Sequence, residues 1–183
     1  MHPSPPSQDA IKHTQTWLER IVIGLSLCPF ARQPYLNDAI RFVETPARTE
    51  EALVADLLQE LTLLQQTPID EIETTLLIHP HVLDDFLDYN DFLGIADACI
   101  EELGLEGVIQ VAGFHPMYQF AGTRVDDIEN ETNRSPYPMM HLIREESITR
   151  VRDAGASTED IPQRNIALLQ EMGRAAFSRL MEE

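Results

Sequence analysis

Two histidines stand close behind predicted strands, each directly before a proline. His79 follows the run 74–78, which is rich in β-branched residues, and His115 comes shortly after the apolar run 108–112. Ligands of open α/β sheets bind at the carboxyl ends of the strands, where imidazoles can act as acids, bases or metal ligands. If the two strands are neighbours, about 4.8 Å apart, both rings can share one pocket. The pair therefore predicts a catalytic site, although each histidine alone is better explained as a polar residue that ends a strand.

Other side chains could complete this site. Asp126 or Glu129 could orient a catalytic histidine or act as a further metal ligand, and Asp126 is the candidate catalytic acid. A bound divalent metal remains open, and its candidate ligands are His79, His81, His115, Cys28 and Glu129. His81 could equally cap a helix or face solvent. Cys28 could be a catalytic thiol, a metal ligand or a buried packing residue, and carbonyls at the end of the preceding helix would raise the pKa of its thiol.

A long segment without regular periodicity, 114–137, connects the third predicted strand to the fourth predicted helix. Such a connection is usually functional or disordered, and the aromatic residues in it favour an ordered functional loop. Guanidinium groups pair with carboxylate or phosphate, so we expect the loop to bind a small anionic molecule. The predicted binding residues are Arg124, Arg134, Tyr118, Asn133 and Tyr137. The alternative is that the two arginines pair with acids of the loop and hold it in place.

Periodicity predicts the elements that position these residues. Helices are expected at about 9–27, 50–66, 82–103, 139–154 and 160–181, and strands at 40–44, 74–78 and 108–112. His141 would then open the fourth helix. The alternation predicts a single α/β domain in which about five helices cover a parallel or mixed sheet of three to four strands with a βαβαβ core. An α+β ferredoxin-like sandwich is the alternative.

Length and charge limit the classes of function. A chain of 183 residues is near the size of one domain, and we expect a disordered tail over 1–8 and one domain over 9–183. The 13 Lys and Arg against 31 Asp and Glu give a net charge of −18, so neither nucleic acid nor a membrane is expected as a partner. The charge is uneven, because residues 49–123 carry fifteen acids and no Lys or Arg.

Several cofactors are not expected. Lys12 is the only lysine and lies near the N-terminus, which disfavours a pyridoxal-phosphate lysine and a P-loop nucleotide site. The Gly-x-Gly-x-x-Gly motif of Rossmann dinucleotide sites is absent from the sequence. Two cysteines and a start without an apolar segment favour the cytoplasm. The sequence makes no prediction of an oligomeric state.

Three motifs resemble those of an uncharacterised family of bacterial proteins of about this length. They are Cys28-Pro29-Phe30-Ala31, Phe114-His115-Pro116-x-Tyr118-x-Phe120-Ala121-Gly122, and Thr132-Asn133-Arg134-Ser135-Pro136-Tyr137-Pro138 followed by His141-Leu142-x-Arg144-Glu145. The resemblance extends from Trp17 to about Arg152. It implies a bacterial cytoplasmic protein whose motifs fall on the segments chosen above. The family is one of unknown function, so the resemblance implies no reaction.

The residues support two functions of different classes. The first is an enzyme, a hydrolase or transferase, that acts on a small anionic substrate through the strand-end histidines with or without a divalent metal. The second is a non-catalytic module that binds a ligand or another protein through the loop 114–137.

Overall fold

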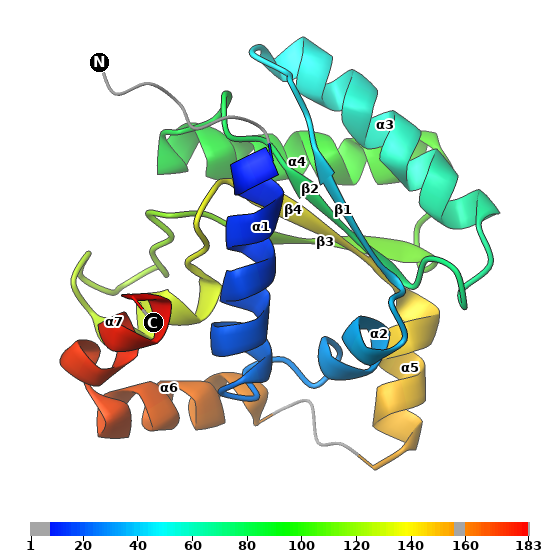
Figure 1. Ribbon diagram of the computed structural model, residues 1–183. Helices are drawn as coiled ribbons and strands as arrows, with labels where there is room; N and C mark the ends of the chain where they lie inside the picture. Colours follow the sequence, from blue (N-terminus) through cyan, green and yellow to red (C-terminus); the bar gives the residue numbers. More distant parts are fainter. Residues whose placement is uncertain (1–7, 156–159, 183) are drawn as a thin grey trace.

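A four-stranded mixed sheet lies at the centre of the protein (Figure 1). The computed structural model describes residues 8–155 and 160–182. The strands are β1 (Ile40–Glu44), β2 (Thr74–Ile78), β3 (Ile109–Phe114) and β4 (Met139–Arg144), in the spatial order β1-β2-β4-β3. The predicted α/β fold with a small mixed sheet is confirmed.

The strand directions bring the ends of β2 and β3 to the same edge of the sheet but not side by side. β1 and β2 are parallel, and β4 is antiparallel to both β2 and β3. β2 and β3 therefore point the same way with β4 between them, about 9.6 Å apart. The condition under which both rings would share one pocket, that the two strands are direct neighbours, is therefore not met. His79 and His115 still leave the sheet at one common edge.

One face of the sheet packs against α3 (Glu50–Gln66) and α4 (Phe86–Glu102), which lie side by side in Figure 1. Their buried side chains form one core cluster with Leu77, Met140 and Leu142 of the sheet. Both helices begin at a capping residue, because the first N–H groups of a helix have no carbonyl partner within the helix. The Thr49 side chain accepts the N–H of Ala52, and the Asp85 side chain accepts two N–H groups of α4.

The opposite face packs against α1 (Gln8–Trp17) and the π-helix that continues it, Leu18–Ile23. The C-terminal helices α6 (Ile161–Met172) and α7 (Arg174–Glu182) lie at one end of this layer, beside the loop 114–137 (Figure 1). Buried residues of all these helices form a second core cluster with the sheet residues Leu76, Ile78 and Met139. The sheet is thus covered on both faces. This agrees with β2, whose five residues are all buried and which therefore needs cover on each face.

The segment 139–154 is not one helix, as its pattern predicted. Its first six residues form β4, and α5 covers only Glu145–Asp153. Met, Leu and Arg favour helices, but five of the six β4 residues are buried between two neighbouring strands, and this tertiary context overrides the propensity. His141 therefore lies inside the sheet and does not open a helix.

The other predicted helices occur with shifted bounds. The first ends at Ile23, and the predicted helix 160–181 is divided at Gly173, whose φ of 76° is not helical. α4 begins at Phe86, later than predicted, because Leu83 has a left-handed φ of 62°. α2 (Arg32–Leu36) was not predicted.

The predicted tail, 1–8, lies outside the described residues except for Gln8, which begins α1. Within the part of the chain that the structure describes, no helix is both long and apolar enough to cross a membrane.

Candidate ligand-binding pocket

The two strand-end histidines are buried and bind the backbone that follows β2. His79 is fully buried, and its Nδ1 donates to the Val82 carbonyl at 3.0 Å. His115 is 1% exposed; its Nε2 donates to the Leu83 carbonyl at 3.1 Å, and its Nδ1 accepts the N–H of Met117 at 3.0 Å. These partners fix the tautomers, because a carbonyl accepts only from a protonated nitrogen. Both nitrogens of His115 thus serve the backbone.

A tyrosine of α4 packs against both imidazoles. The ring of Tyr89 is centred 5.8 Å from His79 and 5.0 Å from His115, and its hydroxyl donates to the Met139 carbonyl at 2.8 Å. Burial lowers the pKa of His79 to about 4, lowers the pKa of His115 and raises the pKa of Tyr89. All three groups are therefore neutral near pH 7. The structure brings the two histidines into one cluster, in which both imidazoles pack against the phenol ring of Tyr89.

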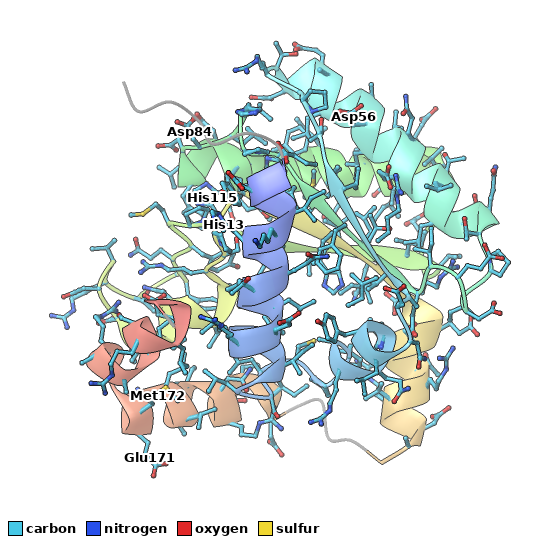
Figure 2. The ribbon with its side chains drawn as sticks, viewed as in Figure 1. His13, Asp56, Asp84, His115, Glu171 and Met172 are labelled. Carbon is cyan, nitrogen blue, oxygen red and sulfur yellow. The ribbon has the colours of Figure 1, made fainter. Side chains whose placement is uncertain are left out.

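The backbone held by these histidines is strained at one residue. Leu83 is buried with a φ of 62°, a region that costs a non-glycine residue on the order of 1–3 kcal/mol. The carbonyls of Val82 and Leu83 each receive one imidazole N–H, which helps to offset that cost. Asp84 follows on the same segment, near His115 (Figure 2). The histidines therefore shape the turn that leads into α4.

The arginines predicted to bind an anion have partners within the loop. Arg124 is largely exposed and pairs with Asp127 at 3.2 Å and with Asp126 at 3.9 Å. Arg134 pairs with Glu131 at 2.9 Å and donates to two loop carbonyls. This geometry matches the alternative in which the arginines hold the loop in place. Anion binding by either arginine, and an orienting role for Asp126, stay predictions.

The two predicted tyrosines lie apart from one another. Tyr118 packs against the rings of Phe86 and Phe120. The Tyr137 hydroxyl is 3.0 Å from Nδ1 of His13, which Figure 2 shows on α1. Burial and the negative charges of two nearby carboxylates raise the pKa of Tyr137.

A pocket of about 490 Å³ lies between the loop 114–137, the π-helix and α6. Ligand sites typically measure roughly 300–1,000 Å³. The pocket brings together three residues that the sequence singled out: Cys28, Glu129 and Asn133. His79, His115, Arg124 and Arg134 do not line it.

The walls of the pocket come from segments far apart in the chain. Val22 of the π-helix and Phe114, at the end of β3, contribute apolar surface, and π-helical turns are frequent at functional sites. A 3₁₀-helix within the loop, Ile128–Asn133, supplies Glu129 and Asn133. The fully buried Asn130 fixes this helix, since its side chain accepts the N–H of Phe120 and donates to the Arg124 carbonyl.

The fourth wall is α6, which two side chains connect to the turn after the π-helix. Asn165 is buried and donates to the Leu27 carbonyl at 2.7 Å, and Arg164 donates to the Ser26 carbonyl at 2.6 Å. Ile161 and Ile166 of the same helix line the pocket. Sequence analysis missed these residues, because an amphipathic helix carries no signal of the loop on which it packs.

Cys28 lines the pocket as a protonated thiol. Burial raises its pKa, and the N–H groups of Phe30 and Ala31, which approach the sulfur, lower it by less. The predicted direction is therefore right, but burial and not the helix carbonyls is the main cause. A buried thiol of this kind is a weak nucleophile at neutral pH. The arrangement is better suited to packing against a ligand than to thiolate chemistry.

A smaller cavity of about 30 Å³, lined by Cys28, Phe114 and His141 among others, adjoins the pocket. The hydroxyl of Thr74 donates to the Leu142 carbonyl, so it accepts from Nε2 of His141, 2.6 Å away. Burial lowers the pKa of His141 to about 4. The cavity has room for about two water molecules.

Among residues 8–155 and 160–182, no three His, Cys, Asp or Glu side chains lie close enough to hold a metal ion together. Of the five predicted metal ligands, only Cys28 and Glu129 line the large pocket. His81 lies near Glu44 at the end of β1. Burial raises the pKa of the Glu44 carboxyl, and the nearby His81 lowers it by less. A metal site at these residues stays a prediction.

Sheet and pocket together define a small α/β protein with a ligand-sized hollow beside a four-stranded mixed sheet. The chain belongs to the DUF1415 family, described as proteins of unknown function, whose model matches residues 9–179. It has no significant match among curated proteins or among solved structures. The predicted membership of an uncharacterised family is confirmed, and its description names no reaction.

Proposed function

We propose that the protein binds a small, largely apolar molecule in the pocket between the loop 114–137, the π-helix and α6. The pocket itself carries this proposal. Its volume of about 490 Å³ suits a small ligand, and its walls are mainly aliphatic and aromatic with few polar groups, as in most ligand sites. The loop that forms one wall is ordered by its own side chains, so the site is largely formed before a ligand arrives.

An enzyme that acts on a small anionic substrate through His79 and His115 has less support. Three of the four nitrogens of these rings have backbone partners, and both side chains are buried outside the pocket. General acid–base catalysis needs a ring within hydrogen-bond reach of the substrate. Binding is therefore the function that the geometry favours.

Filling the pocket tests the proposal. Ile166 lines it, whereas the next residue of α6, Ala167, is exposed. Titration with the neutral fluorophore prodan is expected to give a saturable blue shift with the wild type and with Ala167→Trp. Ile166→Trp, which places an indole in the pocket, should weaken binding at least about tenfold.

Circular dichroism and thermal unfolding test whether both variants fold. If Ile166→Trp does not fold, Ile161→Trp takes its place, since Ile161 also lines the pocket. No saturable binding to the wild type, or equal binding by the two tryptophan variants, would contradict the proposal.

A further inference from the structure

We infer that the ligand of this pocket is an apolar amine, a molecule that brings hydrogen-bond donors and a positive charge to the polar groups of the wall. The inference rests on the proposed function and adds to it the chemical class of the ligand. The residues that line the pocket use most of their hydrogen-bond donors within the protein, and more acceptors than donors remain available to a ligand.

The charged group in the wall is the carboxylate of Glu129. Within the described ranges 8–155 and 160–182, this carboxylate has neither an ion pair nor a hydrogen bond, unlike its neighbours. Glu131 pairs with Arg134 at 2.9 Å and with Arg174 at 2.8 Å. Asp127 pairs with Arg124 at 3.2 Å. The half-buried Glu129 is thus the acid of this part of the loop that is left for a ligand.

The donors of the wall are mostly used within the protein. Each threonine hydroxyl has a single hydrogen. Thr132 donates it to the Glu129 carbonyl or the Asn133 side chain, and Thr123 donates it to the Phe120 carbonyl or the Asn130 side chain. Both hydroxyls therefore offer only lone pairs to a ligand.

The two amides of the wall are also partly engaged. Asn165 donates to the Leu27 carbonyl at 2.7 Å, and Asn133 donates more weakly to the Gly113 carbonyl at 3.4 Å. One hydrogen of each amide and the thiol hydrogen of Cys28 remain. The acceptors that remain are the two carboxylate oxygens of Glu129 and the lone pairs of the two threonine hydroxyls. Acceptors therefore outnumber donors on the charged side of the pocket.

A ligand that carried a carboxylate or phosphate would meet Glu129 without a cation in the pocket wall. Arg164 precedes the wall residue Asn165 in the sequence. Its side chain is exposed and donates to the Ser26 carbonyl and to the Asn165 side chain. An ammonium group would instead form charge-assisted hydrogen bonds with Glu129 while its apolar body packs against Phe114 and Ile166. The net charge of −18 also attracts cations to the molecule.

The experiment compares three probes with one apolar body: naphthylmethylamine, naphthylmethanol and naphthoate. Isothermal titration of the full chain is expected to show the amine binding about tenfold or more tightly than the alcohol, and naphthoate binding most weakly. Glu129→Gln should remove the advantage of the amine over the alcohol and leave the affinity for the alcohol within about threefold.

The matched control is Glu171→Gln, which makes the same change of charge on α6. Glu171 is exposed, and Figure 2 shows it at the outer side of that helix. The affinity of this variant for the amine should stay within about twofold of the wild type, since Glu171 does not line the pocket and the charge of an exposed side chain is screened by salt.

The outcomes separate this inference from the proposed function. If none of the three probes binds, the pocket does not bind small molecules and the proposed function fails. If the alcohol binds and the amine binds no better, or if both Glu→Gln variants weaken the amine equally, the ligand class is wrong while the proposed function stands.

Discussion

Buried polar side chains in this protein mostly contact backbone groups. His115 uses both ring nitrogens for the backbone, and Asn130 joins two loop segments. Arg144 is 9% exposed and donates to carbonyls at the end of α3 and ahead of β2. In a sequence, such residues look the same as catalytic ones, because both roles need a polar side chain inside the fold. Only the positions of their partners tell the two roles apart.

This distinction predicts the effect of removing His115. His115→Ala removes the partners of the buried Leu83 carbonyl and of the N–H of the exposed residue Met117, and it empties the space of a buried ring. The free energy of unfolding should therefore fall by roughly 2–4 kcal/mol. His81→Ala, on the same segment but half-buried and without a hydrogen bond of this kind in the described residues, should lose less than about 1 kcal/mol.

Urea unfolding followed by circular dichroism measures both values. If His115→Ala proves as stable as His81→Ala, the ring of His115 does not hold the backbone after β2, and a catalytic role becomes the better explanation of this residue.

At the scale of elements, local patterns predicted the first three strands and the helices α3 and α4, because each has an apolar pattern of its own in the sequence. β4 could not be predicted in this way, since its strand form depends on β2 and β3, which lie far away in the sequence. The pocket follows the same rule. Cys28, Glu129 and Asn133 have types that stand out, whereas Ile166 lines the pocket only because α6 packs on the loop.

Two glycines show how differently the elements constrain one residue type. Gly94 lies within α4, and a Cβ there would meet nothing within 4 Å. Gly94→Ala should therefore raise the free energy of unfolding by roughly 0.5–1 kcal/mol, the usual gain for alanine in a helix.

Gly113 lies in β3, where a Cβ would stand 2.7 Å from the Tyr89 hydroxyl oxygen and 3.1 Å from Cδ1 of Leu93. Gly113→Ala must displace the Tyr89 ring, which packs against both histidines, and should cost about 1–3 kcal/mol. Urea unfolding of both alanine variants checks the pair. A stable Gly113→Ala would mean that Tyr89 does not pack closely on β3.

At the scale of the whole molecule, much of the negative charge lies away from the pocket, since none of the fifteen acids in the stretch 49–123 lines it. This distribution predicts little about stability between about pH 7 and 5, because ordinary carboxyl groups titrate near pH 4. The groups that change charge in that range are the histidines, and burial gives several of them unusual pKa values.

His79 and His141 set the direction of the pH dependence. Burial lowers the pKa of each to about 4, against about 6.5 in the unfolded chain. Between these values the unfolded chain binds protons that the folded protein does not, so stability is full above about pH 6.5 and is lost as the pH falls toward 4. The lowered pKa of His115 acts in the same direction. Glu44, whose pKa burial raises, acts in the opposite direction because the folded form binds its proton first.

Near pH 5 each of the two histidines contributes a slope of roughly 1 kcal/mol per pH unit, and together they contribute roughly 2 kcal/mol per pH unit. Urea unfolding of the wild type at several values between about pH 7 and 5 should show this fall. His141→Gln removes one of these groups, so the slope of this variant should be clearly smaller than that of the wild type, whatever its stability at pH 7. A wild-type curve that is flat over this range would mean that the histidines are already hydrated in the folded protein. Equal slopes in the two proteins would mean that His141 is not buried in its neutral form.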